Sequence, residues 1–532
     1  MFNKFLLILI FCISTLSAEN VTPQIFSDNM VLQRGIQVPV WGWTEPGTQV
    51  TVNFADQTHS ALSDKNGKWM LKLDKMSASK TPQDMQINIG GQIKVIKNIL
   101  VGEVWLCSGQ SNMQLMMVHS ANPSISKKFR PISRAIKKEM DKAKDPLLRQ
   151  ISVGRVCSPF EGVNNISGKW LQCEPKSNPF FTAAGYYFAK ELRRELDVPV
   201  GLIVAAWGAT RVQSWIPKNA YKNDQGLETY YNTFLERKLD QQKNWDRSKL
   251  TKFEETLKTI KDPAKRKLFE KNRPLEPIMD NKIPGTIYNG MIHPVIPYAI
   301  KGAIWYQGES NVKHLPNEYG KFFAAMIQSW RENWGQGEFP FYFVQLANFR
   351  KAKTHPVEVD NWATICNEQR LTLALENTGM SVSNDIGEPE DIHPHNKVDV
   401  GKRLSLWALA KDYGFNNIVY SGPLYKSSQF KDDKVIITFD HFGSGLMVAE
   451  KHLLNPTREI KDSLLKGFQI CGADRKWQWA SAKIVSKNSI EVFHASVSSP
   501  VEVRYAWSEN PEEANLYNRE GLPTSVFNAV KK

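Results

Sequence analysis

The spacing of hydrophobic and polar positions divides the chain into stretches of different secondary structure. Up to about residue 99, short runs such as Val38–Trp43 and Trp69–Leu73 alternate or nearly alternate hydrophobic with polar residues, and turn-forming residues separate them. Alternation places every second side chain on the same face, which is typical of half-buried β-strands. We therefore predict an N-terminal β-sandwich domain over residues 19–99.

From residue 100 to 415, short hydrophobic runs alternate with segments of helical period. This order predicts a parallel sheet with helices on both faces, which is a doubly wound α/β fold. The predicted strands are Val104–Ser108, Gln150–Val153, Gly201–Ala206, Gly302–Tyr306, Phe339–Leu346 and Met380–Ser383. The predicted helices are Ala183–Glu195, Glu318–Trp334, Trp362–Leu375 and Asp399–Asp412. Two polar insertions, near residues 123–145 and 219–280, are predicted to form surface helices over the sheet.

The residues from 416 to 532 return to short strand-like runs, which include Val435–Phe439 and Val501–Tyr505. These runs predict a C-terminal β-rich domain. The predicted fold class is therefore α/β, with β-sandwich-like domains on both sides of a doubly wound parallel sheet.

Residues 1–18 have the pattern of a signal peptide. Lys4 precedes the hydrophobic run Phe5–Ile13, and small residues follow it. This run is too short for a permanent membrane span, and no later stretch is hydrophobic enough for one. We expect a protein that is exported and is then periplasmic or secreted.

Composition narrows the class of partner. The formal net charge is +14, but Lys and Arg are spread along the chain without a basic run flanked by aromatic residues, so no nucleic acid partner is expected. The 16 Trp residues suit stacking on sugar rings, although core packing is their commoner use. No Cys or His spacing suggests a metal site, and no cofactor is expected. Five Cys remain besides Cys12, so at least one thiol is free, while Cys157 and Cys173 could pair.

Polar clusters follow directly after predicted core strands at four places. Because the carboxyl ends of parallel strands meet at one edge of a sheet, we expect the four clusters to form one site. Loops that carried only solubilising residues would not need such compositions. The clusters are Gly109–Met113, Trp207–Arg211, Gln307–Asn311 and Asp391–His395.

Ser111 stands where the first strand breaks at Gly109 and a helix begins. Unpaired backbone N–H groups and the helix dipole stabilise negative charge there, so Ser111 is a candidate nucleophile. A helix-capping serine is the alternative. In acyl transfer, His393 would accept the hydroxyl proton. The backbone N–H groups of Ser111 and Gly208, with one side-chain amide, could hold the oxyanion.

The four clusters resemble those of the sialate O-acetylesterase family, which belongs to the SGNH hydrolases. The matching segments are Gly109-Gln-Ser-Asn-Met113, Trp207-Gly-Ala-Thr210, Trp305-Tyr-Gln-Gly-Glu-Ser-Asn311 and Asp391-Ile-His-Pro394. The resemblance spans nearly the whole mature chain and implies a flavodoxin-like three-layer α/β/α core of the SGNH type. It also implies an O-acetylated sugar as substrate, typically an acetylated sialic acid, and no metal or cofactor. Acetylated xylan-type polysaccharide is the alternative substrate.

The resemblance assigns roles residue by residue. Ser111 is the nucleophile, His393 is the base, and Gly208 is an oxyanion donor. The side-chain amide of the oxyanion hole is Asn311, with Gln307 as the alternative.

The sequence departs from the family pattern in two places. Ala209 stands where a second Gly is common, which would narrow the site slightly. The last block reads Asp-x-His where many SGNH enzymes have Asp-x-x-His. The third member of the triad is therefore Asp391, Glu390 at the wider spacing, or absent, with a carbonyl group orienting His393 instead.

Several other polar residues have more than one interpretation. Arg211 could pair with a substrate carboxylate or form a surface salt bridge. His293 precedes a strand and is expected to be structural. His395 is expected to be a solvated neighbour of the site, with contact to substrate as the alternative. Glu309 is expected to tie its loop by hydrogen bonds. The candidates for substrate contacts are Gln110, Asn112, Arg211 and Glu309. A carbohydrate-binding protein with an inactive hydrolase core is the competing class.

Overall fold

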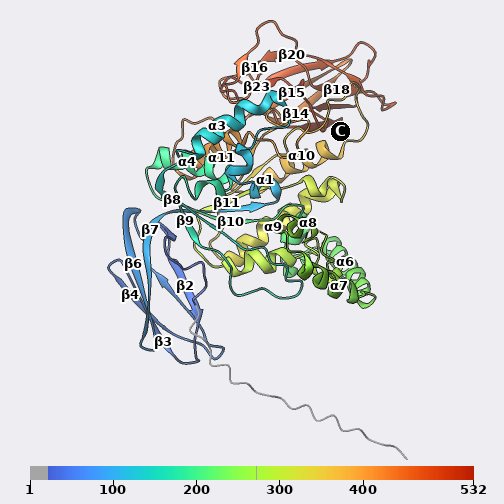
Figure 1. The fold of residues 1–532 in the computed structure, drawn as a ribbon. Coiled ribbons are helices and arrows are strands. Elements are labelled where there is room, and N and C mark those ends of the chain that lie inside the picture. Colours follow the sequence, from blue (N-terminus) through green and yellow to red (C-terminus); the bar gives the residue numbers. More distant parts are fainter. Residues whose placement is uncertain (1–21, 271, 532) are drawn as a thin grey trace, which may run out of the picture.

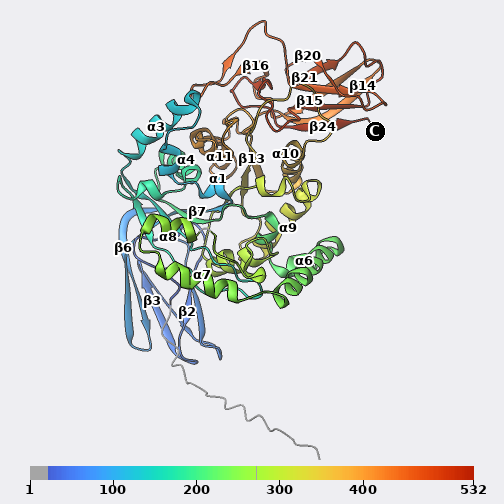
Figure 2. The same ribbon diagram turned by 45° about the vertical axis from the view of Figure 1, so that its right-hand side comes forward.

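The computed structural model describes residues 22–270 and 272–531 (Figure 1). The predicted signal peptide, residues 1–18, lies outside this range. Within the described residues, no helix is both long and hydrophobic enough to cross a membrane. The N-terminal strands and the C-terminal strands lie at opposite ends of the molecule, with the α/β part between them (Figures 1 and 2).

A large and mostly parallel sheet forms the centre of the α/β part. Its strands are β7 (Gln92–Gly109), β8 (Asp145–Ser152), β9 (Trp170–Cys173), β10 (Val200–Ala206), β11 (Gly302–Tyr306), β12 (Phe341–Val344) and β13 (Thr378–Ser381). Their order is β13-β12-β11-β7-β10-β8-β9, and all neighbours are parallel except β8 and β9. The six predicted strands and the α/β class are confirmed.

Helices cover both faces of this sheet, so its strands read as continuous hydrophobic runs. Within β11, Ala303 and Trp305 belong to one hydrophobic core, while Ile304 and Tyr306 belong to the other. The first core contains α9 (Tyr319–Trp334) and α10 (Asn361–Leu371), and the second contains α4 (Ala183–Leu196) and α11 (Lys397–Asp412). The four predicted helices are confirmed, with shifts of a few residues at their ends.

The two ends of strand β7 pair with different sets of strands. Its C-terminal half lies in the central sheet, whereas its N-terminal half pairs antiparallel with β6 (Ser79–Ile89), which also pairs with β3 (Gln49–Phe54). The other N-terminal strands are β1 (Val31–Gln33), β2 (Val38–Trp43), β4 (Gln57–Leu62) and β5 (Lys68–Leu73). The domain boundary predicted at residue 99 falls inside β7 and stays a prediction.

The C-terminal part is rich in antiparallel strands. One sheet has the order β14-β15-β21-β20, a second has the order β19-β18-β22-β24, and a third has the order β17-β16-β23. The bounds are β14 (Leu424–Lys431), β15 (Lys434–Asp440), β16 (Leu446–Glu450), β17 (Arg458–Glu459), β18 (Phe468–Cys471), β19 (Gln478–Trp479), β20 (Ser481–Ser486), β21 (Ser489–Phe493), β22 (Glu502–Tyr505), β23 (Leu516–Asn518) and β24 (Phe527–Val530).

The two polar insertions are helical, as their composition predicts. The first contains α3 (Arg130–Met140), and the second contains α5 (Lys218–Tyr221), α6 (Gln225–Lys243), α7 (Ser248–Thr259) and α8 (Pro263–Glu270). Cys157 and Cys173 do not pair, because every cysteine in the described residues is free.

The three central strands end at the same level, which positions the site. Gly109 at the end of β7 lies opposite Ala206 of β10 on one side and Tyr306 of β11 on the other. Gly109 has a φ of +132°, and a Cβ there would lie 2.2 Å from the Tyr306 carbonyl oxygen. Glycine is therefore required at this position. The chain then turns into the short helix α1 (Ser111–Gln114).

Candidate active site

Ser111 and His393 lie in direct contact above this edge of the sheet. The Ser111 Oγ and the His393 Nε2 are 2.9 Å apart, although 282 residues separate them in the chain. Ser111 is the first residue of α1, and His393 lies on the loop between β13 and α11. The His393 side chain is 36% exposed, so a substrate can reach the pair. Such a contact lets the imidazole accept the hydroxyl proton.

Asp391 lies behind the imidazole. Its Oδ1 accepts the backbone N–H of His393 at 2.8 Å and is 3.5 Å from the His393 Nδ1. Burial opposes ionisation of Asp391, but its contacts with the side chain and backbone of His393 outweigh burial and lower the pKa of the carboxyl group. Glu390, at the wider spacing, is exposed and makes no hydrogen bond or ion pair with the described residues. The geometry therefore favours Asp391 over Glu390 as the group that orients His393.

Gly208 lies against the nucleophile, and a Cβ there would lie 3.3 Å from the Ser111 Cβ. The Gly208 N–H donates to the Gln114 Oε1 at 2.8 Å, so a side chain of α1 occupies this donor in the structure. Ala209 has a φ of +62°, a left-handed conformation that costs a residue with a Cβ about 1 kcal/mol. This conformation explains why glycine suits that position.

Asn311 and Gln307 are fully buried and tie their own loop to the Gly208 loop. The Gln307 Nε2 donates to the Thr210 carbonyl at 3.1 Å and to the Asn311 Oδ1 at 2.8 Å. The Asn311 Oδ1 also accepts the Val212 N–H at 3.1 Å, and its Nδ2 donates to the Gln213 Oε1 at 3.0 Å. In this arrangement the side-chain amides of Gln307 and Asn311 both form hydrogen bonds with other protein groups. Either amide would have to give up one of these bonds before it could donate to an oxyanion.

Asn112 joins three of the loops from a buried position. Its Nδ2 donates to the Glu309 Oε1 at 2.5 Å and to the Ile392 carbonyl at 3.0 Å, and its Oδ1 accepts from the Lys397 Nζ at 2.9 Å. Both amide hydrogens are thus used, which leaves none for a substrate. Glu309 ties its loop, as predicted, but through Asn112.

Gln110 plays a similar part, because its Oε1 accepts the Ser310 backbone N–H at 3.2 Å. It is almost completely buried. Of the predicted substrate contacts, Gln110, Asn112 and Glu309 therefore lie within the framework that holds the loops, and Arg211 lies apart from them.

Lys397 is a buried cation behind the catalytic loop that the sequence analysis missed. Its Nζ donates to the Asn112 Oδ1 and, at 2.5 Å, to the Pro394 carbonyl, next to His393. Burial lowers the pKa of Lys397 to about 8, while the charge of Glu309 opposes this shift. Burial also raises the pKa of Glu309. Lys397 begins α11, where the helix dipole disfavours a cation, and that placement is the signal that could have revealed it.

Arg211 lies among other basic side chains at the side of the site. The Arg211 guanidinium lies beside the Tyr230 hydroxyl, which is 2.8 Å from the His314 Nε2. Burial, Arg211 and Arg237 of α6 lower the pKa of His314 to about 4. Neither arginine forms an ion pair with a carboxylate among the described residues, and the Arg211 Nε is buried without a protein partner. The alternative of a surface salt bridge is therefore wrong for Arg211.

Two further histidines have structural contacts. The His293 Nδ1 lies 3.0 Å from the Val163 carbonyl, as expected for a structural residue. His395 is buried, and its Nδ1 and backbone N–H are both 2.8 Å from the Glu388 Oε1. The prediction that His395 is solvated is wrong, because Glu388 supplies a buried partner. Glu388 in turn accepts from the Ser124 Oγ at 2.6 Å.

Comparisons with known proteins agree with this arrangement. The family model of the carbohydrate esterase, sialic acid-specific acetylesterase, matches residues 101–251 and 279–409. Sialate O-acetylesterase of Rattus norvegicus is 26% identical over 559 residues, which cover 95% of this chain and 93% of that protein. The enzyme of that name from Homo sapiens is 26% identical over 554 residues, covering 94% and 91%.

A solved structure is also similar over nearly its full length. The carbohydrate acetylesterase from Xanthomonas citri is 33% identical, with a TM-score of 0.76, and the match covers 96% of this chain and 99% of that one. Together these comparisons define the protein as a carboxylic-ester hydrolase acting on carbohydrates. The chain belongs to the sialic acid-specific acetylesterase family of carbohydrate esterases.

We predict that Lys397→Met lowers both stability and kcat. Loss of the ammonium leaves the Asn112 Oδ1 and the Pro394 carbonyl unpaired and Glu309 without its countercharge, which should cost about 3 kcal/mol. Adding Glu309→Gln to this variant should recover part of the loss, because the uncompensated charge is then removed. Denaturant unfolding and turnover of an aryl acetate would measure both effects.

Lys451→Met is the matched control, because the Lys451 side chain is also only 5% exposed and its Nζ lies 2.8 Å from the Asp399 carboxylate of α11. It should lower stability and leave kcat nearly unchanged. Equal stability of Lys397→Met and the parent chain would contradict the assigned role of Lys397.

Proposed function

We propose that the enzyme removes acetyl groups from sugars through an acyl-enzyme on Ser111. The observation that carries this proposal is the 2.9 Å contact between the Ser111 Oγ and the His393 Nε2 at the shared strand edge. The Oγ attacks the acetyl carbonyl carbon while its proton passes to the His393 Nε2. The tetrahedral intermediate then expels the sugar oxygen, which takes that proton. A water molecule then attacks the carbonyl carbon of acetyl-Ser111 while His393 takes its proton. The bond between that carbon and the Ser111 Oγ breaks, the proton passes from His393 to the Oγ, and acetic acid leaves as acetate after ionising in water.

The oxyanion is held by the backbone N–H groups of Ser111 and Gly208. The Ser111 N–H stands at the start of α1. The Gly208 N–H becomes available when the half-buried Gln114 side chain turns away and the substrate oxygen replaces its Oε1. Asn311, or Gln307 in its place, is the proposed side-chain donor after exchange of one hydrogen bond. Asp391 orients His393, and their 3.5 Å contact shortens when substrate binds.

The core is proposed to be of the SGNH type. Five strands of the central sheet lie in the spatial order β10-β7-β11-β12-β13. If β8 and β9 are set aside, β7 is the first of these strands along the chain, and it lies between the second, β10, and the third, β11. That is the order of flavodoxin-like sheets, with β8 and β9 added beyond β10. The nucleophile, Ser111, follows β7. The chain places its next strands on opposite sides of β7, and sheets of this kind bind ligands at such a point.

O-acetylated sialic acid is the proposed substrate. Its carboxylate is the group that distinguishes it from neutral acetylated sugars. Arg211 lies three residues after Gly208, and both it and Arg237 lie close enough to His314 to lower its pKa. Neither arginine has a carboxylate partner among the described residues. A guanidinium pairs with a carboxylate through two hydrogen bonds. Acetylated xylan is the second candidate, because the family resemblance includes enzymes that deacetylate plant polysaccharides.

Export is proposed from residues 1–18, and the protein would act in the periplasm or outside the cell. An N-terminus near residue 19 in the purified exported protein would support this location. An N-terminus that retains Lys4 would contradict it.

We predict that Ser111→Ala and His393→Ala each lower kcat on aryl acetates and acetylated sugars at least about 10³-fold. His293→Ala is the control and should leave kcat nearly unchanged, since His293 also precedes a proline but its Nδ1 lies 3.0 Å from the Val163 carbonyl. Acetate release by Ser111→Ala at the parental rate would end the proposal.

The same assay distinguishes the two acidic candidates for the third triad member. Asp391→Asn should lower kcat by about 10²-fold, because the imidazole loses its orienting carboxylate. Glu390→Gln, which removes an exposed carboxylate, should change kcat less than about twofold. The reverse pattern would assign the role to Glu390.

We predict that Arg211→Ala weakens only the use of sialic acid esters. The kcat/KM for O-acetylated sialic acid should fall about tenfold or more, since a charge-assisted pair is lost. The kcat/KM for acetylated xylan should stay within about twofold of the parent value. Arg247→Ala is the control, because Arg247 is an arginine of the neighbouring 219–280 insertion that already pairs with a carboxylate, Glu276, at 3.4 Å. Equal losses on both substrates would contradict carboxylate recognition.

A further inference from the structure

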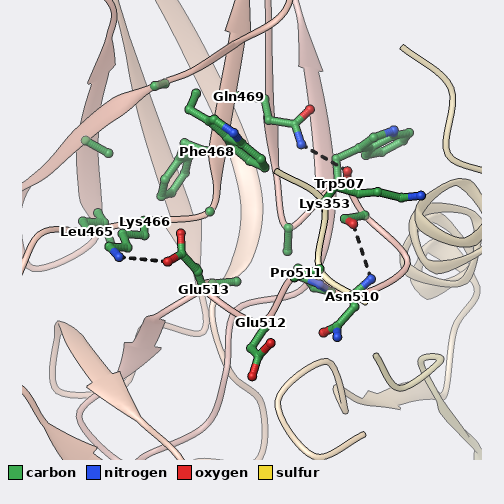
Figure 3. A pocket seen from close by; sticks show the side chains of 18 of the residues that line it. Lys353, Leu465, Lys466, Phe468, Gln469, Trp507, Asn510, Pro511, Glu512 and Glu513 are labelled. Carbon is green, nitrogen blue, oxygen red and sulfur yellow. Dashed lines mark hydrogen bonds and ion pairs between the residues drawn. The ribbon is translucent and has the colours of Figure 1, made fainter. Parts of the chain in front are cut away.

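A cavity of about 860 Å³ lies in the C-terminal part of the molecule (Figure 3). Residues of β18, β19 and the 506–514 segment line it, and the 352–354 segment of the α/β part completes its wall. None of its lining residues belongs to the four clusters of the active site. Its size suits one or two sugar residues, since ligand cavities range from about 300 to 1,000 Å³.

Aromatic rings in the wall are held in fixed orientations. The Arg504 guanidinium lies 4.8 Å from the Trp507 ring centroid and 3.8 Å from that of Trp477, so Trp507 cannot turn freely. The Trp479 Nε1 donates to the Thr354 carbonyl at 3.2 Å while 41% of the residue stays exposed. Exposed indole faces of fixed orientation pack well against the C–H faces of sugar rings.

Two buried polar atoms of the wall have no protein partner. The Gln469 Nε2 donates to the Trp507 carbonyl at 3.1 Å, which fixes the amide and leaves its Oε1 unpaired, although Gln469 is only 1% exposed (Figure 3). The Trp507 Nε1 is likewise buried and unpaired. Such atoms each cost about 1–3 kcal/mol unless a ligand or water pairs with them. One is a pure acceptor and the other a pure donor, so a sugar hydroxyl group that reached them after a small side-chain movement could pair with both.

The charges of the wall favour a neutral ligand. The charged lining residues are Lys353, Lys466, Glu512 and Glu513, which give two positive and two negative charges. The Lys466 Nζ and the Glu513 Oε1 are 3.0 Å apart, and the Glu512 Oε1 lies 3.7 Å from the Nζ of Lys128, outside the wall. Among the charged lining residues, only Lys353 is without an ion pair to the described residues, and its side chain is exposed to water, which weakens its charge interactions. The charges of the wall would therefore add little to the binding free energy of an anionic sugar, in contrast to the contribution expected from Arg211 at the active site.

We infer that this cavity is a second carbohydrate-binding site, which takes a neutral sugar residue of the glycan that carries the acetyl ester. The inference goes beyond the proposed function, because it does not depend on Ser111 chemistry. Holding a distant part of a long glycan raises the effective concentration of its acetyl groups at the active site. Small substrates gain nothing from such a site.

The test uses the full chain with Ser111→Ala, so that no substrate is consumed. Calorimetry would measure binding of two neutral probes, xylohexaose and the disaccharide galactosyl-N-acetylgalactosamine, which represent plant and mucin-type glycans. At least one probe should bind, and Trp479→Ala and Gln469→Leu should each weaken that binding about tenfold. Phe493→Ala is the control, because Phe493 is an exposed aromatic residue of the C-terminal strands that does not line the cavity.

A kinetic readout separates this inference from the esterase proposal. In the active enzyme, Trp479→Ala should raise KM for the acetylated polymer about tenfold and leave its kcat and the turnover of aryl acetate unchanged. Failure of both probes to bind, or binding that neither Trp479→Ala nor Gln469→Leu weakens, would overturn the second site. Loss of aryl acetate turnover in the parent enzyme would instead overturn the esterase mechanism and leave the binding result intact.

Discussion

The register of three neighbouring parallel strands is the constraint on which the site depends. Backbone hydrogen bonds align the ends of β7, β10 and β11, so the residues that follow each strand emerge at one level. The alignment requires the β7 backbone to pass the Tyr306 carbonyl more closely than any side chain permits, which Gly109 alone allows. The position of Ser111, two residues later, is therefore set by the ladder of the sheet.

Buried amides hold the loops above this edge where hydrophobic contacts cannot. Asn112, Gln307 and Asn311 each use their donors and acceptors on groups from other loops. A buried polar network is stabilising only when its members are satisfied, and it then fixes geometry strongly. The Lys397 ammonium completes one branch through Asn112 and Pro394. The reacting pair can remain partly exposed because its support is buried.

Sequence patterns predicted the parts of this site that depend on the spacing of hydrophobic residues and on the direction in which the parallel strands run. Hydrophobic runs located the strands, and the rule for strand ends brought Ser111 and His393 together. Patterns could not predict hydrogen-bond partners that come from other loops. Asn311 forms hydrogen bonds with Val212 and Gln213. His395 can be buried because the Glu388 carboxylate, seven residues earlier in the chain, pairs with its ring. Such pairings depend on side-chain directions that a linear sequence does not contain.

The double membership of β7 has a consequence for how such enzymes can change over evolution. The strand runs without interruption for 18 residues, from its antiparallel pairing with β6 to Gly109, two residues before Ser111. The leading β-region is thus not a removable module that was attached to a finished catalyst. Recombination that replaced it with an unrelated domain would have to rebuild the beginning of the strand that delivers Ser111.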